Sequence, residues 1–121
     1  MYKMYAIVSK EAVKKTNGVR GKMTSQTGHA FLHAFWDAST RYPNAANAYQ
    51  SSEHAVKITL CVDTDQQLLT LLAAYSAVCG TSLVTDQGFT VFKEPTVTCL
   101  GIGPIHQDEV GQDLKDLKLF C

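Results

Sequence analysis

The sequence has neither an excess of charge nor a long apolar run. Its 11 Lys and Arg residues balance 11 Asp and Glu residues over 121 residues, which argues against a protein that coats nucleic acid through bulk electrostatics. No apolar run approaches the roughly 20 residues that a membrane-spanning helix needs. The start, MYKMYAIVSK, lacks the apolar segment and cleavage site of a signal peptide. We therefore expect a soluble, cytoplasmic protein.

The sequence also lacks paired-cysteine and nucleophile motifs. None of its four cysteines belongs to a C-x-x-C pair. Cys61 and Cys99 lie in apolar, strand-like runs, where a thiol behaves as a small hydrophobe, so we expect reduced thiols. Two disulfides are the alternative, which the absence of a secretory signal disfavours. The G-x-S-x-G motif is absent, and apolar surroundings disfavour a reactive thiolate.

Two histidines, His29 and His33, stand one helical turn apart in a helix expected from Met23 to about Ala38. Such a pair can ligate a metal ion, but no acidic residue nearby completes an H-E-x-x-H pattern or supplies a third ligand. We therefore expect no metal and no organic cofactor.

Helix-like and strand-like patterns alternate along the chain. Strands are predicted at 3–8, 56–62, 81–85 and 97–102, and helices at 23–38, after the capping box 64–67, and at about 108–116. Residues 9–22 are predicted as a polar loop, and 39–54 as a loop or a second helix. Gly80 is expected to cap a helix, and Pro104 to end the last strand. The pattern predicts one α/β domain over residues 1–121, with three α/β/α layers and a mixed sheet of about four strands.

A basic, glycine-hinged turn precedes the expected 23–38 helix. Gly18 and Gly21 allow unusual backbone conformations, Arg20 and Lys22 supply positive charge, and the start of the helix would add its free N–H groups. This turn can hold an anion, although it lacks the Walker pattern. The alternative is an ordinary solvated turn, which the glycines and charges alone favour.

A second polar turn, Asp86-x-Gly88-x-Thr90, follows the strand expected at 81–85. In α/β sheets the loops after strands often carry the chemistry. The bend at Gly88 would let the Asp86 and Thr90 oxygens face one cleft. Asp and Gly are also standard turn residues, so a purely structural turn remains the alternative.

Taken together, these turns and their neighbours resemble the type II peptidyl-tRNA hydrolases. The shared motifs are, in order, Arg20-Gly21-Lys22, Gln26, His29-Ala30, Asp86-x-Gly88-x-Thr90, the run from Thr98 to Pro104, and Leu117-Lys118-Leu119. The resemblance covers nearly the whole chain. The ending from Glu109 to Phe120 is more similar to a side branch, the peptidyl-tRNA hydrolase domain-containing proteins.

The resemblance implies hydrolysis of the ester that joins a peptide to tRNA. Asp86 would orient or activate water, and Lys22 or Arg20 would supply positive charge to the oxyanion or to a phosphate. Thr90 and Gln26 would hold water or ribose, and His29 would line the cleft or have a structural role. The implied partner is peptidyl-tRNA, with no membrane, and a homodimer is a further expectation.

Four residues depart from the family pattern. Arg20 stands where the family usually has Lys, and it keeps the charge but cannot share a proton. Gln87, Phe89 and Pro95 also differ. Because of these departures, a family member that binds tRNA or protein without efficient hydrolysis is the alternative function. Hydrolysis of another small ester or amide is a third.

Overall fold

A five-stranded mixed sheet forms the centre of the protein in the computed structural model, which describes residues 1–89 and 92–121. The strand order is β3-β4-β1-β2-β5. The strands are β1 (Tyr2–Ser9), β2 (Lys57–Val62), β3 (Thr81–Asp86), β4 (Thr96–His106) and β5 (Lys118–Leu119). Only β1 and β2 pair in parallel; the other pairs are antiparallel. The sheet exceeds the expected four strands by β5, a two-residue strand too short to give a sequence pattern.

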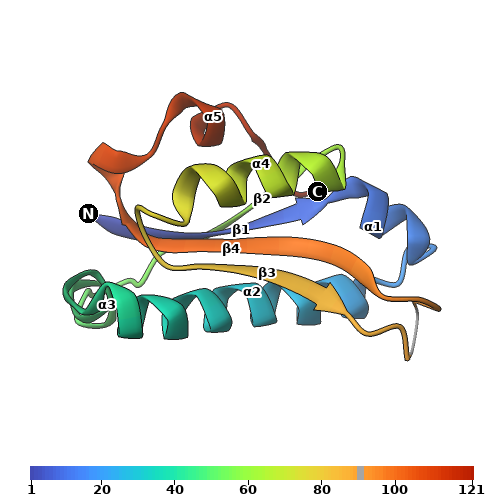
Figure 1. The fold of residues 1–121 in the computed structure, drawn as a ribbon, viewed down its shortest axis with the longest axis horizontal. Helices are drawn as coiled ribbons and strands as arrows, with labels where there is room; N and C mark the ends of the chain where they lie inside the picture. The colour runs from blue at the N-terminus through green and yellow to red at the C-terminus, as the bar shows by residue number, and fades with distance from the viewer. Residues whose placement is uncertain (90–91) are drawn as a thin grey trace.

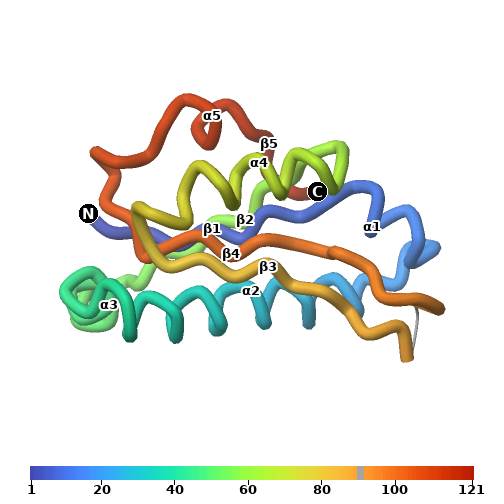
Figure 2. The backbone as a smooth tube through the Cα atoms, in the orientation of Figure 1, coloured from blue at the N-terminus to red at the C-terminus, as the bar shows by residue number. Residues whose placement is uncertain are grey.

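Helices cover both faces of this sheet. Helices α2 (Arg20–Arg41) and α3 (Pro43–Gln50) lie on one face, and α4 (Asp65–Tyr75) and α5 (Gln112–Lys115) lie on the other (Figure 1). Helix α1 (Lys10–Lys15) follows β1 at one end. After β4 the chain rises on the α4 side and returns to the sheet, where β5 pairs with β2 (Figure 2). The expected α/β class and its three layers are confirmed.

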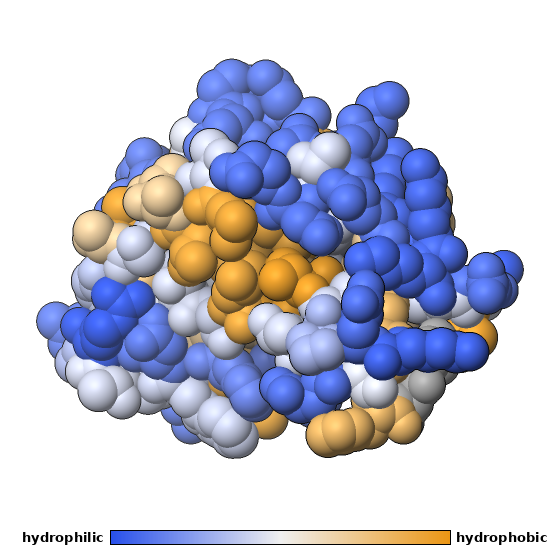
Figure 3. Space-filling model, turned by 45° about the vertical axis from the view of Figure 1, so that its right-hand side comes forward, coloured by the Kyte–Doolittle hydropathy of each residue, from blue (hydrophilic) through white to orange (hydrophobic). Residues whose placement is uncertain are grey.

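The core follows from the alternation of side chains along β1, because neighbouring residues of a strand face opposite sides of the sheet. Ile7 packs with Leu68 of α4, whereas Ala6 and Val8 pack with Ala30 of α2. All five are fully buried. On the face shown in Figure 3, hydrophobic surface gathers in one central area among hydrophilic side chains.

Helix α2 lies unusually close to the sheet. Its buried side chains along this contact are alanines one turn apart, Ala30, Ala34 and Ala38. They face Gly101 of β4 and Gly80, where a Cβ would overlap the main-chain oxygens of Ala30 and Ala34. Glycine is therefore required at both positions by the approach of the helix backbone.

Helix α2 begins at Arg20 rather than at Met23, and α1 lies in the segment expected to be a loop. Val19 precedes α2 without a side-chain capping hydrogen bond, so no Ser, Thr, Asp or Asn marks the start. Residues 20–22 thus form the first helical turn. The open segment 39–54 contains α3, which begins with Pro43 at its first position.

Two predicted ends are wrong, that of the last strand at Pro104 and that of a helix capped by Gly80. Strand β4 continues past Pro104 to His106, because a register shift between Lys3 and Tyr5 places Pro104 in a bulge, where its missing N–H costs no ladder hydrogen bond. Helix α4 ends at Tyr75, so Gly80 is not its cap. The helix expected over 108–116 is divided into a 3₁₀ turn (Gln107–Glu109) and α5 by residues 110–111, whose backbone is extended.

All four cysteines are free thiols. Three are buried, and burial raises the pKa of Cys79 and of Cys99 to about 12. Cys121 alone is exposed. Within residues 1–89 and 92–121, no helix combines the length and the apolar character needed to cross a membrane.

We predict that Gly101→Ala destabilises the fold by more than about 2 kcal/mol, because the new Cβ forces α2 away from β4. Gly28→Ala, in the same helix but with open space at its Cβ, should instead stabilise by about 0.5 to 1 kcal/mol. Urea unfolding curves of both variants measure the effect. Equal stability of Gly101→Ala and the parent would contradict the close contact.

Candidate active site

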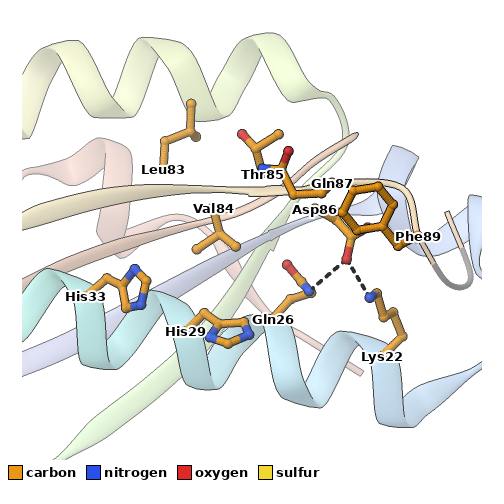
Figure 4. A pocket seen from close by; sticks show the side chains of 10 residues that line it. All are labelled: Lys22, Gln26, His29, His33, Leu83, Val84, Thr85, Asp86, Gln87 and Phe89. Atoms are coloured by element: carbon orange, nitrogen blue, oxygen red, sulfur yellow. Dashed lines mark hydrogen bonds and ion pairs between the residues drawn. The ribbon is translucent and has the colours of Figure 1, made fainter. Parts of the chain in front are cut away.

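A cavity of about 550 Å³ lies between α2 and β3. Figure 4 shows Lys22, Gln26, His29 and His33 projecting from α2 on one side, with β3 and the following residues on the other. Residues that line it from β3 onward are Leu83, Val84, Thr85, Asp86, Gln87 and Phe89. The cavity therefore joins one face of a long helix to the end of a strand, as expected for a site in an α/β protein.

The spacing along α2 explains which side chains reach the cavity. Lys22, Gln26, His29 and His33 are separated by steps of three or four residues, which place them on one face of the helix. Arg20 is only two residues from Lys22, so it points elsewhere. It is exposed and lines a second cavity with Val19, Met23, Phe120 and other residues.

Asp86, at the end of β3, is the centre of the polar contacts in the cavity. Its Oδ2 lies 2.5 Å from Lys22 Nζ and accepts a hydrogen bond from Gln26 Nε2 at 3.2 Å. Its Oδ1 accepts one from the Gly88 N–H at 2.8 Å. Gly88 has φ +86°, so this bend requires the left-handed region that glycine favours. The carboxylate is only 8% exposed.

These contacts keep Asp86 ionised. Burial by itself raises the pKa of Asp86, but the hydrogen-bonded ammonium of Lys22, the Gly88 N–H and the nearby His29 outweigh burial and hold the pKa below its ordinary value. The site thus contains a buried, fixed negative charge beside a positive one.

Gln26 is held from behind by Thr98 of β4. The Thr98 hydroxyl donates to Gln26 Oε1 at 2.9 Å, which leaves the amide nitrogen to donate to Asp86. Gln26 is 4% exposed and Thr98 is fully buried. Buried polar groups of this kind are rigid when each has its partner, so Thr98 fixes the orientation of the amide that contacts the carboxylate.

One phenylalanine contacts the charged pair, and another lines the same cavity. Lys22 Nζ lies 5.9 Å from the centre of the buried Phe92 ring, within the range of a cation–π contact. Phe89 also lines the cavity and is 89% exposed (Figure 4).

The structure brings together four of the residues singled out from the sequence: Lys22, Gln26, His29 and Asp86. Arg20 lies outside this cavity, and Thr90 lies outside the described residues. Neither Thr98 nor Phe92 is expected in the site from the sequence, and His33 is considered there only as a metal ligand beside His29. His33 could have been found from the three-and-four spacing that begins at Lys22. Thr98 opens the family motif that runs to Pro104, but its contact with Gln26 depends on strand pairing that no local pattern predicts.

The arrangement can orient a water molecule against a carboxylate and present an ammonium group to a developing negative charge. Among the residues that the structure describes, no three His, Cys, Asp or Glu side chains converge as metal ligands.

Comparison with known proteins gives a consistent family. The sequence model of the family "Peptidyl-tRNA hydrolase PTH2" matches residues 2–120. The chain is 31% identical to "Peptidyl-tRNA hydrolase" of Methanocaldococcus jannaschii, over 84% of this chain and 88% of that protein. It is 33% identical to the protein of the same name from Methanopyrus kandleri, over 84% and 86%. "Probable peptidyl-tRNA hydrolase 2" of Schizosaccharomyces pombe is 32% identical, over 84% of this chain and 49% of that protein.

We predict that ionised Asp86 stabilises the fold in a pH-dependent way. Because its folded pKa is depressed, this stabilisation is fully present above the unfolded pKa of about 3.9 and is lost as the pH falls through the folded pKa. Urea unfolding of the parent and of Asp86→Asn between about pH 3 and pH 7 measures the difference in their free energies of unfolding. This difference should shrink below about pH 4.

The matched control is Asp63→Asn. In the parent, the Asp63 carboxylate is 80% exposed and lies 3.7 Å from Lys10 Nζ. The difference in the free energy of unfolding between Asp63→Asn and the parent should stay nearly constant over the same pH range. A difference for Asp86→Asn that grows on acidification would mean a raised pKa and contradict the ion pair with Lys22.

Proposed function

The chain belongs to the peptidyl-tRNA hydrolase PTH2 family, and from that premise we propose that its α2–β3 cavity hydrolyses the ester bond of peptidyl-tRNA, releasing peptide and free tRNA. The observation that carries the proposal is the Lys22–Asp86 pair, which is buried at the wall of an open cavity and held by Gln26 and Gly88.

In the proposed reaction, a water oxygen forms a bond to the ester carbonyl carbon, and the bond from that carbon to the ribose oxygen breaks. One water proton ends on the ribose oxygen, and the peptide leaves as a carboxylate with release of the other proton. Such a reaction needs a positioned water and a stabilised oxyanion, and one good donor to the oxyanion contributes about 3 to 4 kcal/mol.

Asp86 positions the water in this scheme. Its depressed pKa makes it a weak base at neutral pH, since general bases work best when their pKa is near the working pH. A fixed carboxylate can still accept a hydrogen bond from water and align the lone pair toward the carbonyl carbon. Lys22, held beside Asp86, supplies the positive charge that the oxyanion requires.

Gln26 and His29 line the same wall and are proposed to bind the substrate. Thr98 acts through Gln26 as a positioning residue. Thr90, two residues after Gly88, is proposed as a further catalytic group on the family resemblance, as a holder of water or ribose. The scheme uses no metal or organic cofactor.

The departures from the family pattern leave this pair in place. Gln87 and Phe89 line the cavity without replacing Lys22 or Asp86. Arg20 is exposed away from the carboxylate, so its change from Lys falls on a residue proposed to bind tRNA phosphate rather than to move a proton. These placements favour hydrolysis over a binding module that lacks activity.

The proposed substrate arises during translation, so we propose action in the cytoplasm. A homodimer is likewise proposed, and light scattering of the purified chain tests it.

Asp86→Asn keeps the shape of the side chain and removes its charge. We predict that this variant remains folded and hydrolyses labelled N-blocked aminoacyl-tRNA roughly 10²-fold more slowly than the parent, because the water loses its negatively charged acceptor. Release of the labelled amino acid measures the rate.

Asp63→Asn makes the same chemical change at an exposed site and should hydrolyse at the parental rate. Equal rates for Asp86→Asn and the parent would refute the role of Asp86. A parent without activity would refute hydrolysis and support the binding-module alternative.

The exposed basic end of the molecule is expected to bind tRNA phosphates. Lys14 and Lys15 of α1 and Arg20 of α2 are all exposed, whereas Lys22 is engaged with Asp86. Arg20→Gln should weaken tRNA binding and lower the slope of log affinity against log salt by about one unit. Filter binding across salt concentrations checks this, and an unchanged slope would show that Arg20 touches no phosphate.

A further inference from the structure

Strand β3 is an edge strand. In the described part of the chain it pairs with β4 on one side and has no strand on the other. The Gly80 carbonyl accepts a hydrogen bond from Gly103 of β4, so by antiparallel alternation Thr81 and Leu83 direct their peptide groups away from β4. Thr81 N–H donates to Asp37 Oδ2 of α2 at 2.9 Å. Within residues 1–89 and 92–121, the outward peptide groups of Leu83 form no hydrogen bond.

Two contacts show how α2 runs along this edge. Lys22, near the start of α2, meets Asp86 at the end of β3, and Asp37, near the end of α2, meets Thr81 at the start of β3. The helix and the strand are therefore antiparallel, and the cavity lies between these two contacts. We call the space between them the α2–β3 groove.

The helix wall of the α2–β3 groove is rich in histidine and aromatic rings. Between Lys22 and Asp37 the sequence has no Lys, Arg, Asp or Glu. His33, which lines the cavity, stacks on Trp36 with ring centres 5.2 Å apart and planes 21° apart. Trp36 is 56% exposed, so its ring is available to a ligand.

We propose that the α2–β3 groove binds the peptide of peptidyl-tRNA as an extended strand that pairs with the outer edge of β3 and rests a side chain on the His33–Trp36 rings. This inference rests on the proposed function. Pairing through the main chain gives affinity for many peptide sequences. The edge from Thr81 to Asp86 is six residues long and spans about 17 Å at about 3.3 Å per residue, which is enough for a tetrapeptide.

The charge along the groove favours the peptide over the tRNA as its occupant. Phosphates bind where Lys and Arg gather, and those residues precede the groove, in α1 and the first turn of α2. At the far end, Arg41 is engaged by Asp37 at 2.6 Å. The tRNA thus approaches from the Arg20 side, the ester lies at Lys22 and Asp86, and the peptide extends toward Trp36.

The test compares two substrates on the same tRNA, an N-blocked aminoacyl ester and an N-blocked tetrapeptidyl ester. For the parent, kcat/KM should be about tenfold higher for the tetrapeptidyl ester, since it adds edge hydrogen bonds and an aromatic contact. N-methylation of its alternate peptide nitrogens should remove most of this ratio. Trp36→Ala should lower the ratio toward one, and Trp36→Phe should restore it.

Leu32→Ala is the matched control, because Leu32 is an exposed apolar residue of α2 that lines a different cavity. In this variant the ratio of kcat/KM for the two esters should equal that of the parent. If the parent hydrolyses both esters with a ratio near one, peptide binding in the α2–β3 groove is overturned, while the proposed function is left intact. Retention of the full ratio in Trp36→Ala or with the N-methylated substrate would also overturn it.

Failure to hydrolyse either ester would instead refute the proposed function. The groove is then tested directly with a tetrapeptide joined through an amide to the 3′ end of a short RNA. Trp36 is the only tryptophan in the chain, so its fluorescence should change with the conjugate and remain constant with the RNA alone. Constant fluorescence with both, or a change only on self-association of the protein, would overturn the proposal.

Discussion

The close contact between α2 and β4 sets the geometry of the rest of the protein. Ala30 and Ala34 lie against Gly101 and Gly80, with no room for a further methyl group. Because larger side chains would hold the helix farther from the sheet, these small residues decide how near the neighbouring face of α2 comes to β3. That nearness is what lets Lys22 and Gln26 reach a carboxylate at the end of the strand.

The site balances desolvation against specific contacts. Asp86 is removed from water, which disfavours its charge, yet three groups from two segments restore that charge. Thr98 extends the network into β4 by fixing Gln26. A carboxylate held in this way does not need to reorganise when a substrate arrives, which is the property that electrostatic catalysis requires.

Sequence patterns predicted the parts of the fold that depend on local chemistry. The capping box of α4 is present, with Thr64 and Gln67 exchanging hydrogen bonds with the backbone. The start of α2 predicted from the sequence is too late, because Val19 gives no capping signal. Helix α1 lies in a predicted loop because it is only six residues long and gives little helical pattern. Local patterns do not predict the features that depend on strand pairing. The bulge that contains Pro104 and the contact of Thr98 with Gln26 both depend on which strands are neighbours.

The unequal burial of the thiols has a practical consequence. Cys79 and Cys99 are deeply buried with strongly raised pKa values, and reagents that attack thiolates react slowly with such groups. Cys121 is exposed and lines the same cavity as Arg20. Of these four cysteines, Cys121 is thus the single accessible attachment point for a spin label or fluorophore. It lies beside the proposed tRNA surface, so the approach of RNA can be followed with the cysteines of this sequence unchanged.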